Sequence, residues 1–425
     1  MTTALDELLR QTTAELDDDI DRAVDALRAA GVRPGDPHVF RAPNTRDTVV
    51  AYRACWRLGA VAVPVHHLAG PGELDRAAGE VGHQDDDIAV VLFTSGSSGT
   101  PKGVRHTYRA LATKASTMAD VHKLTPDDAV LMPAPLAHVS GLLNGILVSG
   151  AAGMRSILME RWDPEAALDI VERERITFMI GPPTFFVDLM GAPSFSSAKV
   201  ASIRLISSGG AGVTEAFVER ASREFDCVVK RTYGSTEAPT VTTSYAGDDP
   251  VKARTTDGRP VGDAELRTDP TTGELELRGS ELFVGYTDPT ATAAAFTADG
   301  WFRTGDIGRI DDEGWLTIVG RIKDVIIRGG ENISAAEVEG VLEAHPAVVA
   351  AVAVGYPDER LGERVAAFVV TRAGFTLQEC RTWFEERGVA RFKTPERVVV
   401  VDDLPRLTSG KPDRAALRSV AADID

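Results

Sequence analysis

The sequence predicts an α/β protein with a large N-terminal domain of α/β subdomains plus a small β-subdomain, followed by a small mobile α+β C-terminal domain. In the first part, helical stretches alternate with short uncharged strands, as in a parallel sheet covered by helices. Short alternating strands and turns fill Gly258 to Gly285. After Lys323 the pattern becomes that of a compact α+β unit. We therefore expect one domain at residues 1–322 and a second at 323–425, joined by a hinge.

The composition restricts the classes of partner. The chain has 425 residues, 43% of them hydrophobic, and a formal net charge of −17. This charge argues against nucleic acid or an anionic membrane as a partner, and an anionic ligand would need a local basic site. The three cysteines, Cys55, Cys227 and Cys380, are far apart in the sequence and form no metal-binding pattern. We expect reduced thiols in a cytoplasmic protein.

The N-terminal elements follow from hydrophobic periodicity. Residues Thr12–Gly31 predict an amphipathic helix that ends at a glycine. A second helix is expected at Thr48–Leu58, and buried strands are expected at Gly59–Val65 and Ala89–Phe93. The uncharged run Ala129–Met154 is long enough to raise the question of a membrane span. Its prolines, asparagine and glycines instead predict a buried strand, loop and helix.

Further along, turn residues separate the expected elements. Ile176–Met190 predicts a strand, a Gly-Pro-Pro turn and a helix, and Leu205–Gly212 predicts a strand that ends in glycines. Two strands should flank the turn Asp311–Gly314. In the C-terminal part we expect a helix, two strands, a helix and a strand, at Ala335–Ala344, Val348–Tyr356, Val365–Thr371, Leu377–Arg387 and Val398–Val401.

The stretch Val91–Gly103, VLFTSGSSGTPKG, predicts a strand that leads into a phosphate-binding loop. Its glycines allow the backbone N–H groups to approach a ligand closely, its hydroxyls add donors, and Lys102 adds a positive charge suited to phosphate oxygens. It is not a Walker loop, because Pro101 and Gly103 flank the lysine where that motif requires glycine and Ser or Thr. We expect a helix at Thr107–Val121 directly after it.

Other polar clusters have both a binding and a structural interpretation. In RTYGSTEAP, Tyr233 offers a ring for stacking on a base, Thr236 a hydroxyl for phosphate, and Glu237 a carboxylate suited to Mg²⁺. Alone, this stretch could also be a strand end and turn. Asp306 could accept ribose hydroxyls and Arg321 could bridge ribose and phosphate, yet each also fits an ion pair at a surface turn.

The stretch FTSGSSGTPKG resembles the phosphate-loop signature of the adenylate-forming superfamily, which includes acyl-CoA synthetases, peptide-synthetase adenylation domains and luciferases. YGSTE, TGD, GRIKD and LPRLTSGKPDR follow in the order of that family. RGGENIS resembles the acyl-CoA synthetases in particular. The chain departs from the pattern in its N-terminal region: the usual leader is missing, and the βαβ stretch before the phosphate loop is reduced to Gly82–Asp87.

The resemblance implies an AMP-forming acid:CoA ligase that uses ATP, Mg²⁺ and CoA. It implies phosphate binding by Thr94, Ser95, Gly96, Ser97, Ser98, Gly99 and Lys102. It implies an adenine site at Gly209, Gly210, Ala211 and Tyr233, ribose contacts at Asp306 and Arg321, and a pantetheine tunnel at Gly329 and Gly330. The implied catalytic residues are Lys411, Glu237 (also the Mg²⁺ ligand), Thr236 and His138, and the implied hinge is Lys323. The acyl-pocket walls would be His138, Phe185, Gly210 and Thr240.

Two alternatives remain open at this point. An adenylating enzyme could pass its product to a carrier-protein thiol or an amine, or could activate a small oxyanion such as nitrite for diazotisation. A nucleotide-binding protein without catalysis would retain the fold but not need all five polar residues Lys102, Glu237, Asp306, Arg321 and Lys411. The expected partners are a small acid, ATP and CoA, with a homodimer possible and neither nucleic acid nor membrane expected.

Overall fold

The computed structural model describes Leu5, Leu9 and residues 14–84, 87–94, 101–407 and 411–424. The chain forms two units. The first contains Met1–Gly210, Ala221–Glu265 and Leu277–Phe302, and the second contains Ala211–Arg220, Leu266–Glu276 and Arg303–Asp425. The hinge expected at Lys323 falls within the second unit and stays a prediction.

The first sheet of the N-terminal unit carries the strands around the expected phosphate loop. Its order is β1-β2-β3-β4-β14, in which β1 to β3 are parallel and β4 and β14 are added antiparallel. The strands are β1 Pro37–Arg41, β2 Val61–Val65, β3 Ile88–Thr94, β4 Lys102–Thr107 and β14 Gly285–Tyr286. Among the described residues between β2 and β3, helix α4, Pro71–Glu80, is the regular element. Strand β3 still pairs with β2, although the sequence predicts a shortened segment, Gly82–Asp87, before the phosphate loop.

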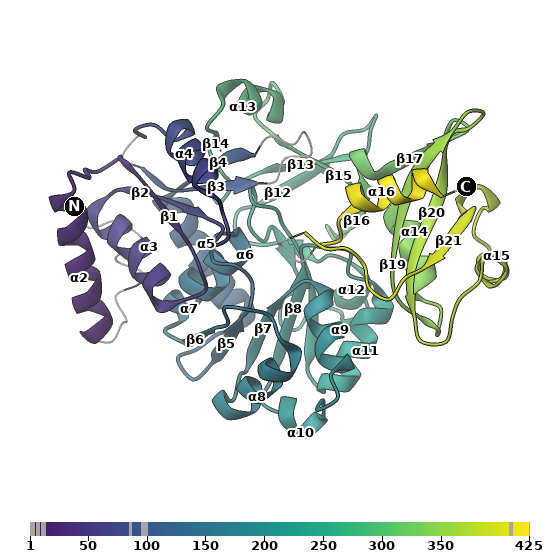
Figure 1. Cartoon of the computed structure of the whole chain (residues 1–425), viewed down its shortest axis with the longest axis horizontal. Coiled ribbons are helices and arrows are strands. Elements are labelled where there is room, and N and C mark those ends of the chain that lie inside the picture. Colours follow the sequence, from purple (N-terminus) through teal and green to yellow (C-terminus); the bar gives the residue numbers. More distant parts are fainter. Residues whose placement is uncertain are drawn as a thin grey trace. The chain divides into compact units, whose positions relative to one another are not determined.

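Three predicted helices of this unit are confirmed as α2 Ala14–Ala29, α3 Arg46–Leu58 and α5 Tyr108–His122. Helices α2 and α3 lie side by side (Figure 1). Strand β4 was not predicted: it lies directly before α5, whose predicted start at Thr107 is confirmed to within one residue. The residues KGVRHT lack an uncharged run, so their strand conformation depends on pairing with β3 and β14 on either side.

The second sheet of this unit has seven strands in the order β11-β10-β9-β8-β7-β5-β6. Its strands are β5 Ala129–Met132, β6 Arg155–Leu158, β7 Phe178–Gly181, β8 Leu205–Gly209, β9 Val228–Tyr233, β10 Thr242–Thr243 and β11 Arg259–Pro260. The helices are α6 Val139–Leu142, the π-helix η1 Leu143–Val148, α7 Ser149–Ala152, α8 Pro164–Glu174, α9 Pro183–Gly191, α10 Ser197–Val200, α11 Glu215–Phe225, α12 Pro250–Thr255 and α13 Pro289–Ala295. The run Ala129–Met154 thus folds as the expected buried strand, loop and helical turns, and no helix in the described part of the chain is long and apolar enough to cross a membrane.

His122 at the end of α5 predicts a specific pH dependence of stability. Its side chain is buried without a hydrogen-bond partner for either ring nitrogen. Burial, together with the charges of Lys230 and Arg204, lowers the pKa of His122 to about 3. Because the unfolded chain takes up the proton more readily, stability from this group is lost as the pH falls below about 6.5.

We expect His122→Leu to remove that part of the pH dependence. Between pH 7 and pH 5, the wild type should lose about 2 kcal/mol of unfolding free energy more than the variant, as the difference between the folded and unfolded pKa values requires. Urea unfolding at the two pH values measures this difference. Equal losses in both proteins would contradict the prediction.

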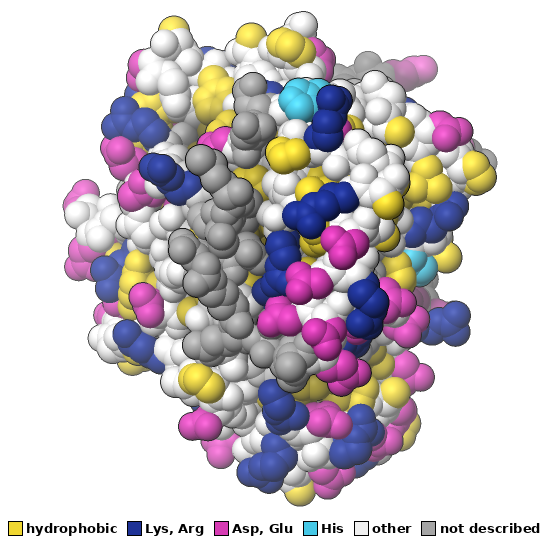
Figure 2. Space-filling model, turned by 90° about the vertical axis from the view of Figure 1, so that its left-hand side faces the viewer, with side chains coloured by type: hydrophobic (Ala, Val, Ile, Leu, Met, Phe, Trp, Pro, Cys, Tyr) yellow, Lys and Arg dark blue, Asp and Glu magenta, His cyan; other side chains and the backbone are white. Residues whose placement is uncertain are grey.

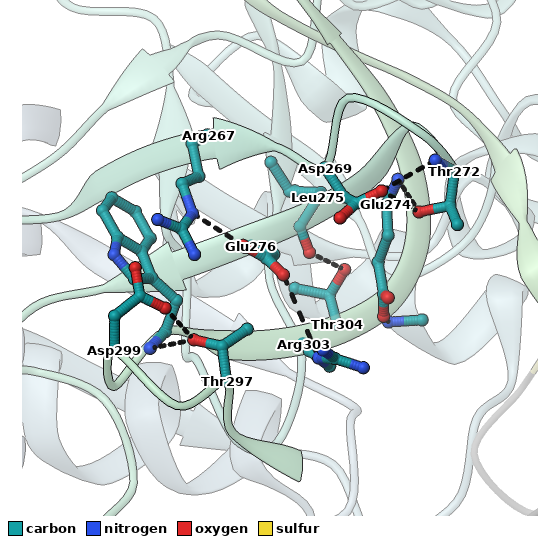
Figure 3. Close-up of polar contacts among 12 residues, drawn as sticks. Arg267, Asp269, Thr272, Glu274, Leu275, Glu276, Thr297, Asp299, Arg303 and Thr304 are labelled. Carbon is teal, nitrogen blue, oxygen red and sulfur yellow. Dashed lines mark hydrogen bonds and ion pairs between the residues drawn. The ribbon is translucent and has the colours of Figure 1, made fainter. Parts of the chain in front are cut away.

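The four-stranded sheet has the order β12-β13-β15-β16, with β12 Glu265–Thr268, β13 Glu274–Arg278, β15 Phe302–Ile310 and β16 Leu316–Arg321. Glu276 of β13 lies between Arg267 and Arg303, with N–O distances of 2.6 and 4.0 Å (Figure 3). On the same strand pair, the Thr304 hydroxyl donates to the Leu275 carbonyl at 2.8 Å. These contacts fix the start of β15, the strand that carries Asp306.

The C-terminal sheet has the order β18-β17-β20-β19, with β21 also paired to β20. Its elements are η2 Ile322–Asp324, β17 Val325–Arg328, β18 Glu331–Ser334, α14 Ala335–Glu343, β19 Val348–Asp358, β20 Gly362–Thr371, α15 Leu377–Glu386, η3 Arg391–Lys393, β21 Arg397–Val400 and α16 Arg414–Asp423. Helices α14 and α15 pack on one set of side chains of β19 and β20, and α16 packs on the other. The five elements predicted from Ala335 onward are confirmed to within a few residues.

The molecular surface agrees with the acidic composition. On the face shown in Figure 2, basic and acidic side chains are interspersed. The contacts of α2 are of this kind: Arg57 of α3 pairs with Asp17 and Asp21 at 2.9 and 2.7 Å.

Candidate active site

The β3–β4 hairpin presents the first group of predicted phosphate ligands. Thr94 is the last residue of β3 and is paired with Lys102, the first residue of β4. Lys102 is exposed, and a pocket of about 420 Å³ lies beside it. The predicted ligands between the strands, Ser95, Gly96, Ser97, Ser98 and Gly99, lie outside the described residues.

The second group lies in the loop after β9, and several contacts hold it. The His106 ring Nε2 lies 2.8 Å from the Thr236 carbonyl oxygen. The backbone N–H of Phe283 donates to the Glu237 carbonyl at 2.8 Å. The Tyr286 hydroxyl donates to Glu237 Oε1 at 2.9 Å. Glu237, the predicted Mg²⁺ ligand, is therefore held by one hydrogen bond to its backbone and one to its carboxylate.

A buried ion pair supports the end of this loop. Lys114 Nζ lies 2.6 Å from Glu281 Oε2, with side-chain exposures of 2% and 1%. Lys114 also donates to the Thr240 carbonyl at 3.0 Å. Thr240 has φ of 38°, which a residue other than glycine rarely adopts, so the lysine contact stabilises an unfavourable backbone conformation. A Cβ at Gly234 would come within 2.4 Å of the Thr240 backbone nitrogen, which explains the glycine in YGSTE.

Tyr286 connects the two groups. The Lys102 ammonium lies 4.9 Å from the centroid of the Tyr286 ring, within the range of a cation–π interaction. Burial and the neighbouring Glu237 carboxylate raise the pKa of the Tyr286 hydroxyl well above its ordinary value. The hydroxyl therefore stays protonated and donates to Glu237 over the physiological pH range.

The predicted adenine site begins at the end of β8. A Cβ at Gly209 would lie 2.3 Å from the Thr232 carbonyl oxygen, so only glycine fits against β9. Gly210 has φ of 78°, a conformation that favours glycine. Tyr233 is the last residue of the neighbouring strand β9. Ala211 follows Gly210 in the sequence and is assigned to the second unit.

The predicted ribose ligands are brought together within the second unit. Asp306 of β15 and Arg321 of β16 are paired residues of the antiparallel ladder. Arg321 Nε lies 2.6 Å from Asp306 Oδ1, and the two side chains are 58% and 8% exposed. The Asp306 backbone N–H donates to the Thr304 hydroxyl at 3.0 Å. The two candidate ribose ligands thus form an ion pair with each other, which is the structural interpretation that the sequence also allowed, and ribose binding stays a prediction.

The remaining predicted residues of the second unit lie in turns. Lys323 is in the short 3-10 turn η2. Gly329 and Gly330 form the tight turn between β17 and β18, with φ of 60° and 89°. Lys411 is exposed, and its carbonyl accepts from the Leu407 N–H at 2.8 Å. Three residues later, Arg414 anchors the chain by donating to both oxygens of Glu339 at 2.6 and 2.9 Å.

The predicted acyl-pocket residues have aromatic surroundings. His138 precedes α6 and is half-buried, with its ring centroid 6.4 Å from that of His66. Phe185 of α9 is buried and packs on Trp162 at a centroid distance of 4.6 Å. Its ring also fills the space over Gly181, where a Cβ would lie 2.6 Å from a ring carbon. Both predicted residues therefore contact other rings, and their role in an acyl pocket stays a prediction.

The sequence interpretation missed four residues that hold the predicted ones: His106, Lys114, Glu281 and Tyr286. Each acts on a residue far away in the sequence, as in the contacts His106–Thr236 and Tyr286–Glu237. The one available signal was the type of residue. A buried lysine and a buried histidine need polar partners, but the sequence shows neither their burial nor those partners.

The donor chemistry fits a magnesium ion shared with a nucleotide. Among the described residues, no group of three His, Cys, Asp or Glu side chains could hold a metal ion by itself. Mg²⁺ is commonly bound through one or two carboxylates together with substrate phosphates. Glu237 supplies one oriented carboxylate, and the Lys102 ammonium lies over the ring of the same tyrosine.

Comparison with known families gives two matches. The model of AMP-binding enzymes matches residues 2–84 and 75–287, and the model of the AMP-binding enzyme C-terminal domain matches residues 337–411. The two stretches of the first match meet at residues 75–84, next to the segment that the sequence indicates is shortened. Together they span both units.

Individual relatives align over nearly the whole chain. The methyl-dioxo-octahydroindenyl-propanoyl:CoA ligase of Mycobacterium tuberculosis is 37% identical over 497 residues, covering 98% of each chain. The medium-chain fatty-acid–CoA ligase of Escherichia coli is 32% identical and covers 92% of this chain and 82% of its own. Among solved structures, ATP-bound MatB from Rhodopseudomonas palustris has a TM-score of 0.85 at 29% identity, covering 96% of this chain and 93% of its own.

Proposed function

This chain belongs to the AMP-binding enzyme family and is an AMP-forming acid:CoA ligase, and we propose how its residues divide the reaction. The observation that carries the assignment of residues is the arrangement around Tyr286. The Tyr286 side chain contacts both the Lys102 ammonium and the Glu237 carboxylate. A triphosphate with a divalent ion needs a positive group for the phosphates and a carboxylate for the ion.

In the first half-reaction, a carboxylate oxygen of the acid attacks the α-phosphorus of ATP. The bond from this phosphorus to the oxygen that bridges to the β-phosphate breaks, and pyrophosphate leaves with the electron pair. We assign Lys102 to the β- and γ-phosphates, because a compact ammonium suits phosphate oxygens. Mg²⁺, when held by Glu237, supplies charge neutralisation for the departing pyrophosphate. Thr236 offers its hydroxyl to the phosphates.

Asp306 and Arg321 hold the nucleoside in this proposal. A carboxylate accepts both ribose hydroxyls, and the planar guanidinium beside it reaches ribose and phosphate together. Gly209, Gly210 and Tyr233 offer bare backbone and a ring to the adenine. Lys411 stabilises the negative charge that develops on the α-phosphate during attack.

In the second half-reaction, the CoA sulfur attacks the acyl carbon of acyl-AMP. The bond to the AMP oxygen breaks, AMP leaves, and the thiol proton passes to solvent. The turn at Gly329 and Gly330 carries no side chains, so we propose that pantetheine passes over it. Lys323 is the proposed hinge, and backbone rotation there would switch the enzyme from the first half-reaction to the second. Hinges are short segments that absorb such rotation.

We propose that the acid has an apolar body. Phe185, a predicted pocket residue, packs on Trp162, and an aromatic lining of this kind favours aliphatic or ring-bearing acids over small charged ones. The two relatives described above are named for a bicyclic propanoyl group and a medium-chain fatty acid, which supports the same class.

Pyrophosphate release across a panel of acids tests this function. The panel contains medium-chain fatty acids, aryl and alicyclic propanoic acids, and nitrite, each with and without CoA. We expect release with one of the apolar acids, accelerated by CoA, and an acyl-CoA product on mass spectrometry. Release that CoA does not affect, or release with nitrite alone, would favour another acceptor or a diazotising enzyme. ATP binding without any release would indicate a non-catalytic protein.

We further propose a cytoplasmic location and a homodimer. The three cysteines are all unpaired with one another, and Cys55 and Cys380 are buried, which is compatible with a reducing compartment. Light scattering of the purified chain measures the oligomeric state directly. A monomer would contradict the dimer without affecting the assigned reaction.

A further inference from the structure

Strand pairing determines where the Tyr286 side chain lies. Tyr286 of β14 is paired with Val104 of β4, so the two side chains share a face of the sheet. Lys102 lies two residues before Val104 and therefore on that same face. As a diagonal neighbour it is within reach of an aromatic ring, and the observed separation of 4.9 Å agrees.

The segment that carries Tyr286 also holds Glu237. The backbone N–H of Phe283 donates to the Glu237 carbonyl at 2.8 Å, and the Tyr286 hydroxyl donates to its carboxylate at 2.9 Å. Tyr286 is itself fixed. Its ring packs edge-on against Phe283 at 5.0 Å, and its N–H donates to the Thr292 hydroxyl of α13 at 2.8 Å. A tyrosine held in this way can orient the carboxylate rather than follow it.

We propose that Tyr286 is a positioning residue that sets the Glu237 carboxylate relative to the Lys102 ammonium for binding of the magnesium–ATP complex. The inference rests on the roles proposed above for Glu237 and Lys102. Mg²⁺ requires near-octahedral geometry, so a carboxylate that rotates freely binds it less well. Hydrogen-bond partners of metal ligands typically account for 10- to 100-fold in metal affinity.

Tyr286→Phe tests the hydroxyl alone, because the ring that faces Lys102 is kept. ATP binding is measured by isothermal titration calorimetry in Mg²⁺ and, separately, in EDTA. We expect roughly tenfold weaker binding in Mg²⁺, the lower end of the range for such partners, and wild-type binding in EDTA. Tyr286→Leu removes the ring as well and should weaken binding in EDTA too. Wild-type affinity of Tyr286→Phe in Mg²⁺, or an equal loss in EDTA, would overturn the proposal.

Tyr245→Phe is the matched control. The Tyr245 hydroxyl donates to the Pro260 carbonyl at 3.2 Å, and the Arg259 guanidinium lies 4.5 Å from its ring centroid. It therefore has the same two kinds of contact, but with residues to which no role is assigned. We expect its ATP binding to equal that of the wild type in both buffers, with a melting temperature that shows any general loss of stability.

A Glu237→Gln background separates positioning from structural support. If Tyr286 acts through the carboxylate, adding Tyr286→Phe to Glu237→Gln causes no further loss of binding. A further tenfold loss would show independent action and overturn the proposal. If the wild type forms acyl-CoA and Tyr286→Phe binds ATP as tightly as the wild type, only the proposed role of Tyr286 is contradicted. If the wild type binds ATP equally well in Mg²⁺ and in EDTA, the proposed role of Glu237 is contradicted, and so is this inference.

Discussion

Replacing Lys411 by alanine will lower the rate of acyl-AMP formation by roughly 100- to 1,000-fold, the loss seen when one donor to a developing oxyanion is removed. The reason is that the proposed ammonium neutralises charge that appears only during attack on the α-phosphorus. Single-turnover release of pyrophosphate measures this step. Transfer of the acyl group from supplied acyl-AMP to CoA should change little, because that step does not use Lys411 in the proposed mechanism.

Lys393→Ala serves as the control for this variant. Lys393 lies in the same unit and pairs with Glu337 at 2.5 Å, so its removal also deletes one lysine charge. We expect near-wild-type rates in both half-reactions. Equal losses of both half-reactions in Lys411→Ala, or no loss in the first, would exclude the assigned role. A melting temperature equal to that of the wild type shows that the variant is folded.

Replacing Lys114 by alanine will destabilise the N-terminal unit by about 3–5 kcal/mol, the usual cost of leaving one partner of a buried ion pair without the other. The Glu281 carboxylate would be left at 1% exposure with only the Thr117 hydroxyl, which donates to it at 2.7 Å. The Thr240 carbonyl would also lose its donor. Urea unfolding followed by tryptophan fluorescence measures the loss.

Two comparisons make this prediction specific. Lys199→Ala breaks a lysine–carboxylate contact of the same length, 2.6 Å to Asp169, with side-chain exposures of 22% and 65%. It should cost less than about 1 kcal/mol, as exposed pairs do. A double variant, Lys114→Met with Glu281→Leu, should recover much of the loss because no charge is left buried. Equal destabilisation by Lys114→Ala and Lys199→Ala would contradict the prediction.

Candidate site residues could be proposed from the sequence where a local backbone conformation depends on a short run of residues. The glycines that end β8, the turn at Gly329 and Gly330, and the YGSTE loop need particular residue types for backbone reasons, so the same letters mark them in any chain. Helices α2, α3 and α5 were equally predictable, because their apolar faces repeat at helical spacing. Strand β4, which the sequence did not predict, lacks a periodic signal of its own.

The sequence by itself determined the family, the order of the binding motifs and the shortened region before the phosphate loop. Only the tertiary structure decided which side chains hold those motifs in place. The contacts Tyr286–Glu237 and His106–Thr236 join residues 49 and 130 positions apart. Partners at such separations are selected by strand register and packing, which no local pattern encodes. For that reason the candidate ligands could be proposed from the sequence, whereas the residues that contact and hold them could not.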